Sequence, residues 1–293
     1  MCLPPEAVAF RRYLKRRQFA AHTVDSYLRD LALFFEQVGE SVMAVTARDV
    51  NAFVEQQQAL GRAVATINRR VATLRAFYRF LREDGDGQLV SPVRRSHFLR
   101  RPRPLPQPLS EGDVALLLGA LEGARDRALF LLMLRSGLRV QEVAALQPCD
   151  VNLAEQTALV RQSKNGKDRL VYLAEDACRL LEAYLAGQRE RKDQSVFLVD
   201  KGRCRGKGLS VRGIQKRIEH YAQKIGRPLS CHSLRHTFAT ELLDAGADIV
   251  TVQELLGHSA VSTTRGYTKV ANNRVRNEYF AGIAAVIKGE RPV

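Results

Sequence analysis

One segment near the end of the first third of the sequence limits every fold that the chain can adopt. Residues 85–108, GDGQLVSPVRRSHFLRRPRPLPQP, contain five prolines and five arginines. Proline lacks a backbone donor and disfavours helix in the residue before it, so no regular helix or central strand can run through this stretch. We therefore predict two domains, over 1–100 and 109–293, joined by a stiff basic linker over 101–108. The length of 293 residues agrees, because one hydrophobic core seldom grows further.

The first domain is predicted to consist of helices joined by short loops. Apolar side chains recur at helical spacing over 24–38 and again over 64–81, and Thr23 stands where a cap of the first of these helices is expected. Thr46 is placed to cap a shorter helix between them. Arginines follow one edge of the second apolar stripe: Arg75, Arg79 and Arg82. Such a row is usually a solvated face, but the high density of cations in residues 1–104 favours a helix that faces DNA.

The second domain is predicted to be mainly helical with a small antiparallel β-sheet. Ser110 can cap a helix, and an apolar helix after it ends at Gly137. Residues 157–173 alternate on either side of Asn165-Gly166, a dipeptide typical of a two-residue hairpin turn. The remaining elements are expected to be a helix over 174–190, a short strand over 196–199 and several helices over 211–287.

The balance of charge indicates a polyanionic partner. Lys and Arg number 46 against 31 Asp and Glu, giving a net charge of +15, and 36 of the cations are Arg. Arginine grips phosphate with a planar fork, and residues 1–104 alone carry +8, so both domains are basic. The segment 200–208, DKGRCRGKG, is especially cationic and is interpreted as a phosphate-contacting loop. Net charge alone does not tell whether the polyanion is DNA or RNA, or whether the chain only binds it or also catalyses a reaction on it.

Several other classes of protein are excluded. Nothing approaches 18 consecutive apolar residues, so no membrane span is expected, and the first residues lack the basic-then-apolar order of a signal peptide. The five cysteines are odd in number, far apart and without a CxxC pair. This pattern favours free thiols in the reducing cytoplasm over a disulfide framework or a cysteine zinc site.

Three short motifs and one lysine contain residues that could carry chemistry. They are Arg139 in SGLRVQEV, His232, Arg235 and His236 in CHSLRHTFAT, His258 and Tyr267 in LLGHSAVSTTRGYTKV, and Lys164 beside the hairpin turn. Each alone has an ordinary structural explanation, such as a cation at a helix end or an amphipathic core tyrosine. A zinc site at His232 and His236 would need a third ligand nearby, and the motif lacks the Glu of the zincin pattern.

Taken together, these residues suit phosphoryl transfer without a metal ion. No carboxylate cluster for Mg²⁺ accompanies them. Two guanidinium groups can stabilise the charge that builds on the non-bridging oxygens of the phosphate, and a tyrosine can attack and later leave. A lysine on a hairpin can protonate the departing 5′ oxygen.

The motifs resemble those of the tyrosine recombinases, or phage integrase family, and most of all those of its Xer-like members. The resemblance covers nearly the whole chain and is specific over about 126–270. It implies six catalytic residues: Arg139 in GLRVQEV, Lys164 in SKNGKDRLVYL, His232 and Arg235 in HSLRH, His258 in LLGH and Tyr267 in TTRGYT. The last residue of HSLRH, His236, takes a supporting position. Cys231, where a proline is expected, and Lys269, where many relatives carry histidine, depart from the family pattern without removing a catalytic group.

The resemblance also implies an architecture and a reaction. The two domains would form a C-shaped clamp around double-stranded DNA with inverted half-sites, with 1–100 as a SAM-like DNA-binding domain and 109–293 as the catalytic domain. Tyr267 would form a 3′-phosphotyrosyl bond that the 5′ hydroxyl of a partner strand reverses, with no cofactor and no metal. A homo- or hetero-tetramer on paired sites is expected, and a DNA translocase and a second recombinase are candidate further partners.

The sequence leaves some alternatives open. Apolar residues in the tail could pack within their own subunit, although the resemblance favours docking on a neighbour: Val275, Tyr279, Ile283, Val286 and Ile287. The chain could resolve chromosome dimers, or integrate and excise a mobile element. From other classes, the alternatives are a type IB topoisomerase and a non-catalytic DNA-binding regulator.

Overall fold

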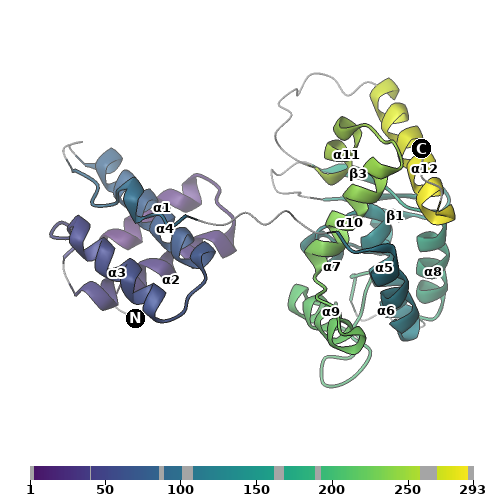
Figure 1. Cartoon of the computed structure of the whole chain (residues 1–293), viewed down its shortest axis with the longest axis horizontal. Coiled ribbons are helices and arrows are strands. Elements are labelled where there is room, and N and C mark those ends of the chain that lie inside the picture. Colours follow the sequence, from purple (N-terminus) through teal and green to yellow (C-terminus); the bar gives the residue numbers. More distant parts are fainter. Residues whose placement is uncertain are drawn as a thin grey trace. The chain divides into compact units, whose positions relative to one another are not determined.

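The computed structural model describes residues 3–39, 41–85, 89–100, 108–161, 168–188, 193–257 and 269–289, without the side chains of 269–272. The chain divides into two compact units, Met1–Pro104 and Leu105–Val293 (Figure 1). Each unit has a hydrophobic core of its own. Within the described ranges, no helix is long and apolar enough to cross a lipid bilayer.

The N-terminal unit is a bundle of helices around an aromatic core. Its elements are α1 (Glu6–Arg16), α2 (Ala21–Val38), α3 (Ala47–Ala59), α4 (Val64–Asp84) and the short 3-10 helix η1 (Arg95–His97). Phe34 of α2 packs edge-on against Phe53 of α3, with ring centroids 5.1 Å apart, and Phe10 of α1 meets Phe77 of α4 at 5.3 Å. Aromatic pairs of this kind join all four long helices.

The helices expected in this unit form, with one error at a cap. Thr46 caps α3 as predicted, and its backbone N–H donates to the Asp49 carboxylate over 2.7 Å. The prediction for Thr23 was wrong. The helix begins earlier, at Ala21, and the N–H of Thr23 donates to the carbonyl of Ala20, so Thr23 lies inside the first turn.

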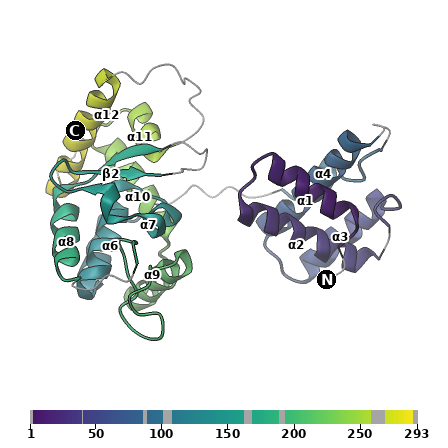
Figure 2. The same ribbon diagram turned by 180° about the vertical axis from the view of Figure 1, so that it is seen from behind.

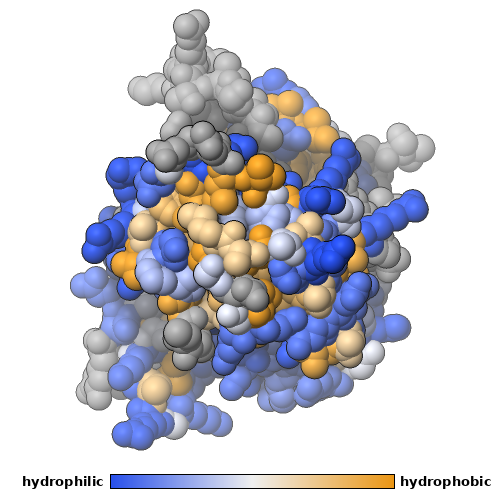
Figure 3. Space-filling model, turned by 90° about the vertical axis from the view of Figure 1, so that its left-hand side faces the viewer, coloured by the Kyte–Doolittle hydropathy of each residue, from blue (hydrophilic) through white to orange (hydrophobic). Residues whose placement is uncertain are grey.

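The face seen in Figure 3 combines an apolar area with a hydrophilic border. The arginines predicted to follow one edge of α4, which are Arg75, Arg79 and Arg82, are all exposed. The Arg75 guanidinium lies 4.8 Å from the ring centroid of Phe98, and Arg79 forms a 3.9 Å ion pair with Glu83. The row is therefore exposed, two of its arginines have local partners, and its contact with DNA stays a prediction.

The second unit is mainly helical with a small antiparallel sheet, as predicted. Its elements are α5 (Glu111–Ala120), α6 (Gly123–Ser136), α7 (Val140–Ala145), η2 (Pro148–Asp150), β1 (Val151–Asn152), β2 (Thr157–Val160), β3 (Arg169–Tyr172), α8 (Glu175–Ala186), α9 (Val211–Ile225), α10 (Cys231–Asp244), α11 (Ile249–Leu256) and α12 (Lys269–Lys288). Ser110 caps α5 by accepting a hydrogen bond from the N–H of Asp113 over 3.1 Å. The sheet has the order β1-β2-β3.

The centre of the second unit is α6, which packs against α8 and α10 (Figures 1 and 2). Residues 128–134 of this helix read ALFLLML and are all buried. A helix that is apolar on every side belongs in the interior, because no face of it prefers water. The C-terminal end of α6 is consequently fixed from several sides, and the candidate site is built on that end.

The hairpin of the second unit is confirmed in its strands. β2 and β3 pair antiparallel, with Thr157 opposite Tyr172, while the predicted turn at 165–166 lies outside the described residues. The short strand predicted over 196–199 was wrong. That stretch makes an isolated bridge, Leu198 to Gly208, because the chain turns back on itself there instead of meeting a sheet edge.

The C-terminal helix α12 packs on its own unit. Tyr279 and Ile283 are buried there, and the Tyr279 hydroxyl donates to the Arg135 carbonyl over 2.9 Å. The Tyr279 ring also lies 5.7 Å from that of Tyr172. In this single chain, Tyr279 and Ile283 therefore have partners within their own subunit, and docking of the tail on a neighbour stays a prediction. Ile287, further along the helix, is exposed.

Candidate active site

The end of α6 sets the position of Arg139. Gly137 follows the helix with φ at +61°, a conformation that side chains rarely adopt. A Cβ atom at Gly137 would lie 2.3 Å from Cδ1 of Phe238, so space as well as conformation requires glycine. After this turn the chain reverses into α7, where Arg139 is the N-cap residue.

Glu142 fixes Arg139 at the start of α7. Its carboxylate accepts the backbone N–H of Arg139 over 2.8 Å and the Arg139 Nη1 over 2.9 Å. Nη2 of the same guanidinium donates to the carbonyl of Gly257, at the end of α11, over 3.2 Å. Arg139 is thus held between a carboxylate and the C-terminal end of a helix, where cations are favoured.

A second arginine, Arg169 of β3, shares the same carboxylate. Its Nη1 and Nη2 donate to the two oxygens of Glu142 over 2.7 and 2.9 Å, a bidentate pair. Burial by itself would raise the pKa of Glu142, but the hydrogen bonds and charges of Arg169 and Arg139 outweigh burial and the pKa is lowered. Glu142 therefore stays ionised at neutral pH.

Arg235 of α10 is bound by backbone carbonyls. Nη1 donates to the carbonyl of Gly137 and Nη2 to that of Leu256, each over 2.5 Å. The side chain is buried, and burial together with repulsion from Arg139 lowers its pKa to about 10, which leaves it charged at pH 7. Three helix-end carbonyls, at Gly137, Leu256 and Gly257, therefore hold the two arginines that the sequence predicted.

The charged side chains at the ends of α6 and α11 carry a net positive charge. Among the described residues, Arg139, Arg169 and Arg235 surround a single carboxylate, that of Glu142, and act on one another electrostatically. Two positive charges remain, in a partly buried position where an ion is screened less than in water. Fixed guanidinium groups with surplus charge are suited to bind a phosphate and to stabilise the extra negative charge of its transition state.

His232 and His236 lie one turn apart on α10, and their imidazole rings are in contact. Their Nε2 atoms are 3.0 Å apart, and the rings are nearly perpendicular with centroids 4.5 Å apart. Burial, then the charges of His236 and Arg235, lower the pKa of His232. Among the described residues, no group of three His, Cys, Asp or Glu side chains could hold a metal ion at this pair.

Cys231, the departure from the family pattern, is the first residue of α10. The first position of a helix is where proline is favoured, because the missing N–H would have no partner there. Ser230 caps the helix by accepting the N–H of Ser233 over 3.0 Å. Burial raises the pKa of the Cys231 thiol to about 11, so the thiol stays protonated at neutral pH.

The structure therefore brings three of the six predicted catalytic residues together: Arg139, His232 and Arg235. Lys164, His258 and Tyr267 lie outside the described residues. Two supporting residues were not predicted. Glu142 had a local signal, since an acidic residue three positions after a helix start is typical of a capping motif. Arg169 had none, because its role depends on the pairing of β3 in the fold.

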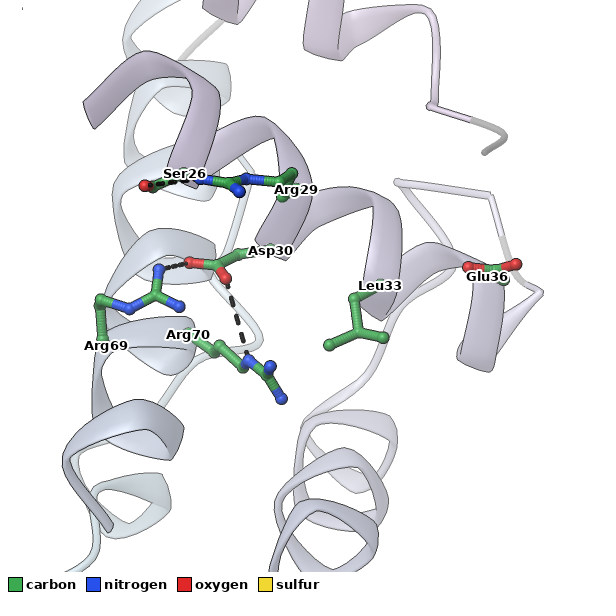
Figure 4. Close-up of a pocket in the computed structure, with 7 residues that line it drawn as sticks. All are labelled: Ser26, Arg29, Asp30, Leu33, Glu36, Arg69 and Arg70. Carbon is green, nitrogen blue, oxygen red and sulfur yellow. Dashed lines mark hydrogen bonds and ion pairs between the residues drawn. The ribbon is translucent and has the colours of Figure 1, made fainter. Parts of the chain in front are cut away.

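A polar pocket in the N-terminal unit is the other notable cluster of charge (Figure 4). Asp30 of α2 is buried and pairs with Arg69 of α4 and, over 3.8 Å, with Arg70. Thr73 also donates to Asp30 over 3.0 Å. The pocket of about 380 Å³ is further lined by Arg29. These contacts tie α2 to α4 and leave guanidinium groups at the surface.

Both units match family models. Residues 108–274 match the Phage integrase family, and residues 7–85 match the Phage integrase, N-terminal SAM-like domain. Together with the site at the ends of α6 and α11, these matches show that the chain belongs to the phage integrase family, the tyrosine recombinases, and is an enzyme of that class.

Individual relatives agree with this membership. The chain is 34% identical over 269 residues to tyrosine recombinase XerA of Pyrococcus horikoshii, a match of 91% of this chain and 90% of that protein. It is 38% identical over 275 residues to tyrosine recombinase XerD of Ralstonia nicotianae, covering 88% and 86%. The integrase of transposon Tn1549, solved with circular intermediate DNA, shares the fold with a TM-score of 0.72 at 17% identity, over 94% of this chain and 99% of that one.

Proposed function

We propose that the chain is a site-specific DNA recombinase that cuts and rejoins DNA strands through a 3′-phosphotyrosyl intermediate, with Tyr267 as the nucleophile. The observation that carries the proposal is the surplus of positive charge at Arg139 and Arg235. Both guanidinium groups are fixed by helix-end carbonyls before DNA arrives. Groups fixed in advance need no reorganisation when charge develops on the phosphate.

The proposed reaction conserves the energy of the phosphodiester. The Tyr267 oxygen attacks the scissile phosphorus and the bond to the 5′ oxygen breaks. His232 accepts the phenolic proton, and Lys164 gives a proton to the departing 5′ oxygen. Arg139 and Arg235 stabilise the non-bridging oxygens, and His258 donates a further hydrogen bond to them. The 5′ hydroxyl of the partner strand then attacks the phosphotyrosine and restores both groups, so no nucleotide cofactor or metal is required.

Glu142 and Arg169 support this chemistry without touching the phosphate. The Glu142 carboxylate orients Arg139, and Arg169 keeps Glu142 ionised through its bidentate contact. Loss of either residue is expected to weaken transition-state stabilisation through the position of Arg139. Both therefore belong to the proposed site as positioning residues.

The partner proposed for both units is double-stranded DNA with inverted half-sites. Arg29 and Arg69 at the surface of the N-terminal unit, together with the cationic segment 200–208 of the second unit, supply cations for phosphate contacts. Exchange between two duplexes breaks four strands, and each break needs one nucleophilic tyrosine. Four subunits on two paired sites, identical or of two kinds, satisfy this count.

The biological role proposed is that of the Xer-type relatives, which is the resolution of chromosome dimers, or the movement of a mobile element by the same reaction. The described cysteines are free thiols, which agrees with an enzyme acting on DNA in the cytoplasm. Purified chain that recombines two sites by itself would need neither a second recombinase nor a DNA translocase. Exchange that appears only on addition of either protein would identify it as a partner.

A nicked half-site, from which the cut fragment diffuses away, tests the proposal. The wild type should form a covalent protein–DNA adduct on its own site, and Tyr267→Phe should bind that site without forming one. Absence of an adduct with the wild type on its genuine site, sought first in the DNA that flanks the gene, would overturn the proposal. Relaxation of a supercoiled plasmid without exchange between two sites would favour a topoisomerase instead.

A further inference from the structure

We infer that His236 is a positioning residue for His232: it holds the Nε2 atom of the acid–base histidine until the scissile phosphate and the nucleophile arrive. The inference rests on the proposed function, because it assigns a partner to one of the groups that perform it. The carrying observation is the contact between the two imidazole rings, with Nε2 atoms 3.0 Å apart.

The contact is a hydrogen bond between like side chains on one helix face. Residues four apart on a helix lie one above the other, which places His236 a single turn from His232. A separation of 3.0 Å with perpendicular rings fits one N–H donating to the lone pair of the other nitrogen. Among the described residues, His236 has no other hydrogen-bond partner than His232. The contact is therefore the one polar interaction that this part of the structure gives to His236.

The contact also limits the charge that the pair can carry. A positive charge on His236 disfavours protonation of His232, whose ring is in hydrogen-bond contact with it. The guanidinium of Arg235, on the same helix, opposes a second proton further. On the neighbouring elements, Arg139 and Glu142 of α7 and Arg169 of β3 act on Arg235 and leave a net positive charge. Burial first, and then the charges of His236 and Arg235, lower the pKa of His232.

This arrangement agrees with the proposed role of His232 as the base that accepts the tyrosine proton. A base that accepts the tyrosine proton must be unprotonated before reaction, and His236 disfavours its protonation. A base must also be oriented, and a ring with a fixed hydrogen bond occupies fewer rotamers. When substrate enters, His232 exchanges its contact with His236 for one with the reacting group.

Kinetics across pH separate these contributions. The rate of adduct formation in a single turnover is measured from pH 5 to 9 for the wild type, His236→Gln and His236→Ala. Glutamine can donate a hydrogen bond to His232 but carries no titrating charge. The plateau rate of His236→Gln should therefore stay within about twofold of the wild-type rate. The acid limb, which is the fall in rate at low pH, should move to higher pH by about 0.5–1 unit. Alanine should shift the limb equally and lower the plateau about tenfold, because the ring is no longer oriented.

Two further measurements make the outcome decisive. Half-site affinity should agree within about twofold among the variants, and His22→Gln, a histidine replaced in the N-terminal unit, should reproduce the wild-type profile. Imidazole ¹⁵N shifts of DNA-free protein should show His232 titrating in two coupled steps in the wild type and in one step at higher pH in His236→Gln. These shifts do not depend on catalysis, so they separate failure of the contact from failure of the proposed function.

Superimposable pH profiles of the wild type and His236→Ala would overturn the inference, as would a His232 titration unchanged by His236→Gln. Absence of any adduct with the wild type would instead overturn the proposed function, and the assignment of His236 to catalysis with it. A parallel fall in half-site affinity and in rate, without a shift of the acid limb, would reduce His236 to a structural residue.

Discussion

Arg235 of α10 donates from Nη1 to the carbonyl of Gly137 over 2.5 Å, although the two residues are 98 positions apart in the chain. The same guanidinium binds Leu256 of α11, while Arg139, two residues after Gly137, binds Gly257. The ends of α6 and α11 are thus tied to one another through the two arginines proposed to bind phosphate. Substitutions that disturb these ties should affect both stability and DNA cleavage.

Gly137→Ala should destabilise the catalytic unit by about 3 kcal/mol. Part of the loss comes from the left-handed conformation and part from overlap of the new Cβ with the Phe238 ring, 2.3 Å from it. Thermal unfolding measures the loss, and adduct formation should fall with it because the carbonyl that receives Arg235 moves. The matched control is Gly226→Ala, at φ +66° with no atom within 4 Å, which should cost only about 1 kcal/mol. Equal losses at the two positions would show that the contact with Phe238 is unimportant.

Glu142→Gln should reduce stability in a pH-dependent way. The folded pKa of Glu142 is lowered from its ordinary value of 4.5, so its ionised form stabilises the fold above that value and the contribution is lost as pH falls through the folded pKa. At pH 7 the variant leaves three guanidinium groups without a carboxylate, a loss of about 3 kcal/mol. The difference in unfolding free energy between wild type and variant should therefore narrow below about pH 4.5. A difference that stays constant from pH 7 to pH 3 would contradict the ionised Glu142.

The cationic segment 200–208 should contribute to the salt dependence of DNA binding. Its base is fixed, since Asp200 pairs with Arg125 over 2.9 Å, while hydrogen bonds from Ser195 and Gly208 lower the pKa of Asp193 to about 2. Four exposed cations lie between these anchors: Lys201, Arg203, Arg205 and Lys207.

Replacing all four with glutamine should make the negative slope of log K for DNA binding against log salt shallower. The magnitude should fall by up to about 3.6, or about 0.9 for each phosphate that the protein no longer neutralises. Half-site affinity measured at several salt concentrations gives the slope. The control is Arg179→Gln on α8, an exposed arginine paired with Glu175 over 3.9 Å, which should leave the slope unchanged. An unchanged slope in the fourfold variant would show that the segment does not touch DNA.

Removal of the Tyr279 side chain should destabilise the catalytic unit. Tyr279→Ala removes a buried ring and the hydrogen bond to the Arg135 carbonyl, a loss of about 4 kcal/mol. Ile287→Ala, at an exposed position of the same helix, should change stability by less than about 1 kcal/mol. Chemical unfolding of the two variants makes the comparison. Equal, small effects would favour the alternative prediction, in which the tail has its partners in a neighbouring subunit.

The sequence was most informative where local chemistry decides the structure. Apolar periodicity predicted α2 and α4, and the ALFLLML stretch of α6 was predicted as a buried helix ending at Gly137. Thr46 and Ser110 were recognised as caps because a short polar side chain before an apolar run has few other uses. Thr23 satisfied the same pattern and failed, because helix α2 starts at Ala21 and its N-cap residue is Ala20, which has no capping side chain.

The site could be predicted only in part, for a physical reason. Arg139, His232 and Arg235 stand in short motifs, whereas their partners are backbone carbonyls at Gly137, Leu256 and Gly257 that no pattern of side chains reveals. The importance of Arg169 likewise arises only when β3 pairs with β2. The packing of Tyr279 could not be predicted, since the pattern of apolar residues along a helix is the same whether that face packs on its own subunit or on a neighbour.

Identification of the DNA-linked residue tests the proposed Tyr267 chemistry most directly. After trapping on a nicked half-site, trypsin should release the linked tyrosine within residues 266–269, because Arg265 and Lys269 flank it. Mass spectrometry should find that peptide joined to a nucleotide through a 3′ phosphate, with a free 5′ hydroxyl on the released strand. Attachment of DNA to any other residue, or through a 5′ phosphate, would contradict the tyrosine recombinase mechanism proposed for this chain.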